Sequence, residues 1–175
     1  IVFTPNVFCV DYLGKDLLTN SRADIPLKFD NIYTNPPWGS DKEGLYTANY
    51  PLIKSKERAS MVIAESLHRL KENGTLHFLL PTSLLKIKSH NDIRRYILSN
   101  TTIHQIDIYK DRFDGVFTDY FSIKLCPQKT QKQSYVVTSD KGSSLVTLPD
   151  SDYASGNIAI ENFSMIDNSI INKME

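Results

Sequence analysis

The chain has 175 residues, which is enough for one domain with a single sizeable hydrophobic core. Its 20 Lys and Arg residues balance 20 Asp and Glu residues, so no net charge draws the whole chain to nucleic acid. No apolar run approaches the length of a transmembrane helix, and the 4 histidines and 2 cysteines lack metal-site spacing. We therefore expect a cytoplasmic protein with no membrane span and no metal ion, in which Cys9 and Cys126 are buried reduced thiols.

Strand and helix patterns alternate along the chain, which predicts an α/β fold with a parallel sheet and helical crossovers. In chain order, we expect strands at 7–10 and 31–34, a helix at 59–70, a strand at 75–80, a helix at 83–99 and strands at 103–109 and 120–125. The apolar residues of the first helix fall on one continuous face, and Asn73-Gly74 is the expected end of that helix. The loop between the last two strands is short enough for an antiparallel pair.

Two polar segments interrupt the first half of this pattern. Residues 13–28 are irregular, with turn-forming residues among them. Residues 39–56 form a long loop in which Tyr46 and Tyr50 are suited to close over a bound base.

The amino-acid composition of the chain changes beyond Cys126. Residues 127–133 have the composition of a polar linker, and residues 134–139 are expected to form a short strand. From Asp140 onward, Ser, Asn and Asp dominate, with isolated apolar runs. We therefore divide the chain into a first domain at 1–126 and a linker with the start of a further region at 127–175.

The tetrapeptide Asn35-Pro36-Pro37-Trp38 follows the strand at 31–34 directly and carries the strongest functional signal. The two prolines lack backbone N–H groups, and Pro36 favours extended geometry at Asn35, which presents the Asn35 amide at the strand's tip. The Asn35 amide oxygen and the Pro36 carbonyl can accept both hydrogens of an –NH2 group, which makes its nitrogen a better nucleophile. Trp38 offers a flat face for the ring that carries the amine.

A simpler interpretation of the same residues is a tight turn after a buried strand, with Trp38 packed beside it. The functional interpretation is favoured, because ligand sites of open α/β sheets lie just beyond the carboxyl ends of the strands.

The tetrapeptide resembles motif IV of the S-adenosylmethionine-dependent amino-group methyltransferases, specifically the DNA adenine-N6 methyltransferases of bacterial restriction–modification systems. Residues 6–13 are similar to the motif III strand, and residues 59–70 and 73–81 to the helix and strand that follow motif IV. Residues 112–125 resemble motif VIII, so the resemblance covers about residues 6–126.

This resemblance implies a Rossmann-like methyltransferase sheet, mostly parallel with a reversed final hairpin. It also implies S-adenosylmethionine as cofactor and double-stranded DNA with a flipped adenine as substrate. By the family's pattern, the catalytic residues are Asn35, Pro36, Pro37 and Trp38, the cofactor-binding residues are Asp11, Tyr12 and Asn35, and the residues that stack on the target base are Trp38 and Phe113.

The chain departs from the family in one respect, because none of its 7 glycines forms the expected Gly-x-Gly cofactor loop. It also opens on Ile1 rather than Met. We therefore expect the distal part of a catalytic domain, lacking its first strands, from a longer enzyme that also meets restriction or specificity subunits. Two alternatives stay open: a non-catalytic or degenerate methyltransferase fragment that acts as a binding module, and an RNA or protein-glutamine N-methyltransferase.

Several residue assignments also stay open at this point. Asp11 matches motif III better than its rival Asp16, although Asp16 is nearer in sequence to the motif IV strand. Phe113 fits the motif VIII aromatic better than Phe117, and Phe121 is expected in the core. The basic clusters are either contacts to a phosphate backbone or solvated helix faces, and they comprise Lys54, Lys56 and Arg58, Lys86 and Lys88, Arg94 and Arg95, and Lys110 and Arg112.

Overall fold

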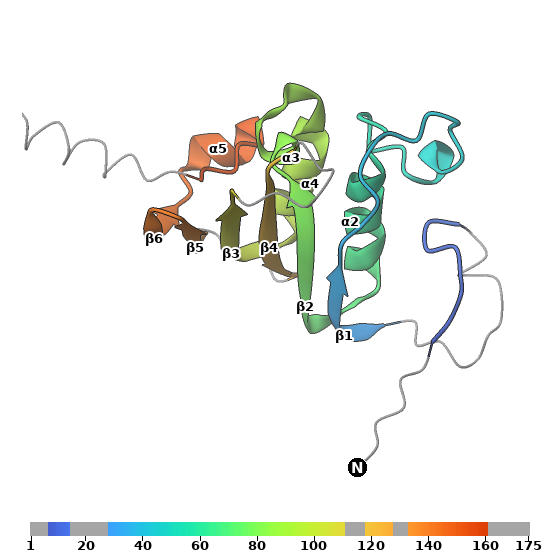
Figure 1. Ribbon diagram of the computed structural model, residues 1–175, viewed down its shortest axis with the longest axis horizontal. Helices are drawn as coiled ribbons and strands as arrows, with labels where there is room; N and C mark the ends of the chain where they lie inside the picture. The colour runs from blue at the N-terminus through green and yellow to red at the C-terminus, as the bar shows by residue number, and fades with distance from the viewer. Residues whose placement is uncertain (1–6, 15–27, 111–117, 128–132, 161–175) are drawn as a thin grey trace, which may run out of the picture.

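A computed structural model describes residues 7–14, 28–110, 118–127 and 133–160 of the chain. Its centre is a six-stranded sheet in the order β1-β2-β4-β3-β5-β6 (Figure 1). The strands are β1 (Phe29–Thr34), β2 (Leu70–Pro81), β3 (Thr102–Tyr109), β4 (Tyr120–Cys126), β5 (Ser134–Ser139) and β6 (Gly142–Thr147).

The sheet is mixed rather than mostly parallel. β1 pairs with β2 and β3 with β5 in parallel, whereas β4 is antiparallel to both of its neighbours and β6 to β5. The reversed hairpin expected at 103–125 is confirmed, since β4 returns between β2 and β3. The second reversed strand, β6, comes from the segment that the sequence did not assign to the sheet.

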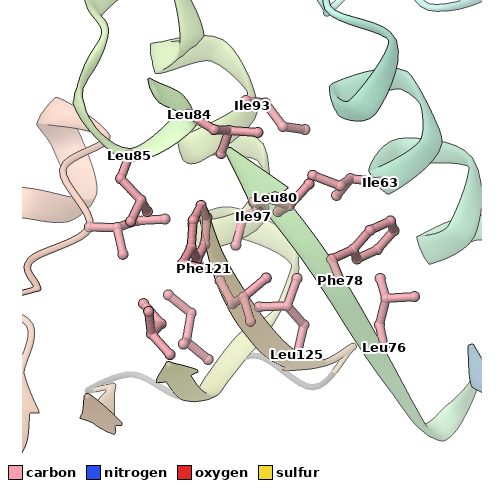
Figure 2. Packing of buried hydrophobic residues seen from close by; sticks show 14 of the residues in the cluster. Ile63, Leu76, Phe78, Leu80, Leu84, Leu85, Ile93, Ile97, Phe121 and Leu125 are labelled. Carbon is pink, nitrogen blue, oxygen red and sulfur yellow. The ribbon is translucent and has the colours of Figure 1, made fainter. Parts of the chain in front are cut away.

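The helices are α2 (Arg58–His68), α3 (Ser83–Lys86), α4 (Asn91–Asn100) and α5 (Asp150–Ser155), with short 3-10 turns η1 (Thr47–Asn49) and η2 (Lys88–His90). Burial alternates along the central strands, so one face of the sheet holds the apolar side chains. Phe78 of β2 and Phe121 of β4 lie on that face, and Figure 2 shows them with Ile63 of α2. Phe121 is fully buried, as the sequence predicted.

Residues 7–10 do not form the expected strand. Val7 is 84% exposed, and no strand pairing is assigned to this segment within the described residues. A β-prone run forms a strand only where a neighbour supplies pairing and packing, and the described residues supply neither here. Cys9 is therefore exposed rather than buried, while Cys126 is partly buried at the end of β4.

The first helix ends earlier than its sequence suggested, at His68, and Asn73 and Gly74 lie within β2. Gly74 allows a close approach of β1 to β2, at a point where the pairing register of the two strands shifts between Phe29 and Asn31. A Cβ at Gly74 would lie 2.7 Å from Leu70 Cγ and 2.8 Å from the Asp30 carbonyl oxygen. The glycine therefore marks a close backbone approach, not a helix end.

The helix expected at 83–99 is broken into α3, η2 and α4, because Ile87 has extended geometry. The buried Arg94 side chain stabilises this break. Its guanidinium donates to the carbonyl oxygens of Leu84 at 2.7 Å and Ile87 at 2.9 Å, and Nε donates to that of Gly156 at 2.8 Å. One arginine thus joins the end of α3 to the end of α5.

Residues 133–160 continue the same sheet and core, although the sequence placed a boundary after residue 126. The buried Gln133 amide donates to the Thr101 carbonyl at 2.7 Å and accepts from the Ile103 N–H at 3.0 Å. The Tyr135 hydroxyl donates to the Ala159 carbonyl at 2.7 Å. The stretch from Asp140 onward, for which the sequence analysis named no helix or strand, contains β6 and α5.

Candidate functional site

The tetrapeptide lies just beyond the carboxyl end of β1, where the sequence placed it. Asn35 is exposed, Pro36 is buried and Pro37 is exposed. Trp38 is partly buried and packs against the hydrophobic core. The chain therefore holds Asn35 between a fixed strand and an anchored indole, which restricts the directions in which the amide can point.

The two ends of the loop at residues 39–58 are hydrogen-bonded to each other. The Gly39 N–H donates to Glu57 Oε1 at 2.6 Å, and the Arg58 N–H donates to the Gly39 carbonyl at 3.0 Å. Ser40 and Glu57 form an isolated antiparallel bridge. Gly39 has a φ of 107°, which side chains disfavour, so glycine suits this sharp departure from Trp38. The base of α2 is thereby joined to the tetrapeptide.

Asp41 organises the inside of this loop. Its buried carboxylate accepts from the N–H groups of Leu45 at 3.1 Å, Tyr46 at 2.9 Å and Thr47 at 3.0 Å, and from Thr47 Oγ1 at 2.9 Å. Burial by itself raises the pKa of Asp41, but the hydrogen bonds from Tyr46, Thr47 and Leu45 outweigh it and lower that pKa. The loop is therefore folded around a charged carboxylate.

Tyr46 connects this loop to the segment at 11–14. Its hydroxyl donates to Asp11 Oδ2 at 3.1 Å, and the Leu13 N–H donates to Asp11 Oδ1 at 3.1 Å. The hydrogen bond to Asp11, followed by a smaller effect of burial, raises the pKa of Tyr46. Asp11 is exposed, so its carboxylate keeps lone pairs for a further donor.

Tyr12 and Tyr50 converge on α2. The Tyr12 hydroxyl forms a 2.8 Å hydrogen bond with Ser66 Oγ, and its ring centroid lies 5.7 Å from the Arg69 guanidinium carbon. The Tyr50 hydroxyl donates to Glu65 Oε2 at 3.0 Å, and Glu65 forms a 2.7 Å ion pair with Arg69. Burial, followed by the Glu65 charge and hydrogen bond, raises the pKa of Tyr50. These contacts link the segment at 11–14, the loop and α2.

The structure thus brings Asp11 and Tyr12 to the loop that follows Asn35, through Tyr46 and α2. Asp16, Phe113 and Phe117 lie outside the described residues, so the choice of Phe113 as the stacking aromatic stays a prediction. Sequence reasoning missed four supporting side chains, which are Asp41, Glu65, Ser66 and Arg69. Only the Glu65–Arg69 pair carried a sequence signal, because it has the i,i+4 spacing of a helical ion pair.

Trp38 Nε1 is buried and has no hydrogen-bond partner among the described residues. A buried indole N–H normally finds an acceptor, so this donor is an unsatisfied polar group next to the tetrapeptide. The exposed Asp11 carboxylate offers acceptors, and the exposed Asn35 side chain offers both a donor and an acceptor. Such a mixture suits a nucleoside-containing cofactor and an aminated base.

Within the described ranges, no group of His, Cys, Asp and Glu side chains is arranged to hold a metal ion. None of the helices there is long and apolar enough to cross a membrane.

Comparison with known proteins identifies the family. A family model described as the Eco57I restriction-modification methylase matches residues 14–117. The chain belongs to this methylase family. The match includes the tetrapeptide and the whole loop folded around Asp41, and it confirms the predicted kinship with restriction–modification methyltransferases.

Relatives of this methylase agree with the assignment. The chain is 33% identical over 121 residues to the type II methyltransferase M.VspI of Vibrio sp. strain 343. That match covers 65% of this chain and 29% of M.VspI, so the chain spans less than a third of that relative's length.

Two solved structures have the same fold. A modification subunit of a putative type I restriction enzyme from Vibrio vulnificus YJ016 has a TM-score of 0.55 and 17% identity, over 83% of this chain and 32% of that one. A putative class I S-adenosylmethionine-dependent methyltransferase from Listeria monocytogenes has a TM-score of 0.50 and 13% identity, over 63% of this chain and 36% of that one. The methylase therefore has the fold of S-adenosylmethionine-dependent methyltransferases.

Proposed function

We propose that this chain is the distal part of the catalytic domain of a longer restriction–modification enzyme. That enzyme would transfer a methyl group from S-adenosylmethionine to the N6 amine of adenine in DNA. The observation that carries the proposal is the position of Asn35-Pro36-Pro37-Trp38, at the carboxyl end of β1 with the Asn35 amide exposed. Membership of a restriction–modification methylase family supports the reaction class.

Asn35 and Pro36 act on the amine of the base. The Asn35 amide oxygen and the Pro36 carbonyl accept its two N–H groups, which directs the nitrogen lone pair toward the methyl group. When bound, S-adenosylmethionine supplies that methyl group. The C–N bond would form in line as the bond between the methyl carbon and the sulfonium sulfur breaks, and the sulfur would leave as a neutral thioether. The amine would then release one proton to solvent, and no covalent bond to the protein would form. Pro36 and Pro37 have no N–H groups that could compete for these acceptors.

Trp38 and Phe113 sandwich the extruded adenine in this proposal, and Asp11 and Tyr12 hold the adenine end of the cofactor. Trp38 is suited to stacking because the core fixes one side of its indole. Asp11 is suited to the cofactor's amine because its exposed carboxylate accepts only two hydrogen bonds from the described residues. A flipped base in double-stranded DNA is the corresponding substrate.

The further partners would be restriction or specificity subunits or domains, and the compartment would be the cytoplasm, where the DNA of a bacterial cell lies. The shared family with restriction–modification methylases supports both points.

The test compares Asn35→Ala and Asn35→Asp in the full-length protein that contains this chain. Asn35→Ala removes a preorganised acceptor and should lower kcat by about 10²–10³-fold, whereas Asn35→Asp keeps an oxygen acceptor and should lose less. Methyladenine in DNA from cells that express each variant is counted by mass spectrometry. Undiminished methylation by Asn35→Ala would remove Asn35 from the mechanism.

Labelled cofactor separates the alternative substrates. The full-length protein is assayed against DNA, RNA and a glutamine-containing release-factor-like protein. Label in DNA alone supports the proposal, and label confined to RNA or protein replaces it. No label in any substrate, together with retained DNA binding, would favour a degenerate methyltransferase that acts as a binding module.

A further inference from the structure

Exposed lysines gather in the two connections that leave the sheet beside Asn35. Lys42, Lys54 and Lys56 lie in the loop that follows β1, and Lys86 and Lys88 lie in the α3–η2 connection that follows β2. Because β1 and β2 are parallel, both connections leave the same end of the sheet (Figure 1). The lysines therefore share the edge that presents the tetrapeptide.

Asp92 fastens the two connections to each other. Its Oδ2 accepts from the backbone N–H of Lys54 at 2.5 Å and from that of Ser55 at 3.2 Å, although these residues are far apart in the chain. Asp92 belongs to the first turn of α4, which directly follows η2 and Lys88. The end of the long loop is thus held against the start of α4, and the lysines of both connections form one surface.

Three of the four acidic side chains of this region accept backbone N–H groups, and the fourth, Glu43, is exposed. Asp41 and Asp92 accept from backbone N–H groups, and Glu57 accepts from Gly39. Within the described parts of the chain, none of the five lysines forms an ion pair. By contrast, Lys71 at the opposite end of β2 pairs with Asp30, and Lys110 after β3 pairs with Asp140. Residues 39–58 and 82–92 together hold six Lys and Arg residues against four Asp and Glu residues, so a chain with no net charge carries an excess of positive charge beside the tetrapeptide.

We propose that Lys54, Lys56, Lys86 and Lys88 form a contact surface for the phosphate backbone of double-stranded DNA, and that this surface positions the duplex so that its extruded base meets Asn35. The inference rests on the proposed function and assigns the residues that hold its substrate. Exposed lysines that form no ion pair with the protein suit phosphates, because each contact releases a counterion from the duplex.

The backbone conformation of Lys56 allows a substitution that removes its charge without disturbing the loop. Lys56 has a φ of 56°, in the left-handed region that glycine adopts more easily. Its carbonyl accepts from the Asp41 N–H at 2.7 Å, so the residue also closes the loop. Lys56→Gly removes the charge and keeps this geometry, which separates the loss of charge from a loss of loop structure.

The test measures binding to a short fluorescein-labelled DNA duplex by anisotropy over a range of NaCl concentrations, with the full-length protein. Lys86→Gln/Lys88→Gln is compared with Lys71→Gln/Lys124→Gln, which removes the same charge from β2 and β4, outside the two connections. The first double variant should lower the slope of log K against log salt by about 1.8, since each phosphate contact contributes about 0.9. Lys56→Gly should lower it by about 0.9.

An unchanged slope in the Lys86/Lys88 double variant, or an equal loss in the Lys71/Lys124 control, would overturn the inference. The measurement needs no methyl transfer, so it is independent of the proposed reaction. If the salt slope falls in the Lys86/Lys88 variant but the full-length protein methylates no DNA, only the proposed reaction is refuted. If the full-length protein methylates DNA but the slope of the variant is unchanged, only the phosphate-contact surface is refuted.

Discussion

Replacement of Arg94 by alanine should destabilise the fold more than any comparable change on α4. Arg94 is 6% exposed, and its guanidinium donates to three carbonyl oxygens, those of Leu84, Ile87 and Gly156. The hydrogen bonds to Leu84 and Gly156 are buried, so truncation leaves these two carbonyls without the donor that Arg94 supplies, whereas Ile87 also accepts from the His90 N–H at 3.1 Å. At about 1–3 kcal/mol for each buried acceptor, we expect a loss of about 3–5 kcal/mol of unfolding free energy. For a chain of this length, that lowers Tm by about 10 °C.

Urea unfolding of the 175-residue chain measures this loss, with the fluorescence of Trp38, its 1 tryptophan, as the probe. Arg95→Ala is the matched control, because Arg95 is the neighbouring arginine of the same helix and is exposed. Its loss should stay within about 0.5 kcal/mol. If Arg94→Ala were no more damaging than Arg95→Ala, the carbonyls would have other donors and the argument for Arg94 would be wrong.

Three further predictions concern residues near the site and the first strand pair. Gly74→Ala should cost about 1–3 kcal/mol by urea unfolding, because the new methyl group would meet Leu70 Cγ at 2.7 Å; an unchanged midpoint would contradict this close approach. The lowered pKa of Asp41 means that its stabilisation of the loop is complete above its usual value of 3.8 and is lost as pH falls through the lower folded-state pKa. Asp41→Asn should therefore speed hydrogen exchange of the loop amides at neutral pH and remove the pH dependence of the loop's stability. Wild-type exchange rates in this variant would refute the prediction. Asp11→Asn should lower the pKa of Tyr46, since the hydrogen bond to that carboxylate raises it; ultraviolet titration of the tyrosines in this variant and in Tyr46→Phe measures the change, and an unaltered Tyr46 pKa would exclude the contact.

The strands β1 to β4 were predictable because each contains a short apolar run that is bounded by turn-forming or polar residues. Residues 7–10 have the same apolar character, yet they form no strand because pairing depends on a neighbour that local sequence does not reveal. The break at Ile87 was also hidden from local patterns. It depends on Arg94, whose donors reach carbonyls on both α3 and the end of α5.

The same distinction applies to the candidate site. Asn35 could be placed from sequence, because a strand followed by two prolines fixes its own end. Asp41 could not, since an aspartate in a long polar loop is usually solvated, and only the folded loop brings three N–H groups to it. The pairing of Tyr12 with Ser66 likewise joins residues that are 54 positions apart.

The strand order has a consequence for synthesis of the protein on the ribosome. β2 and β3 do not pair with each other, and both require β4, which is the last of the three to be made. Until residue 126 has emerged, the nascent chain carries β2 and β3 with unpaired edges. Folding of the centre must therefore wait for contacts between distant parts of the chain, which are slow to form and expose the intermediate to aggregation. Any expressed piece that ends before β4 would keep these open edges permanently, whereas a piece that ends after it closes them.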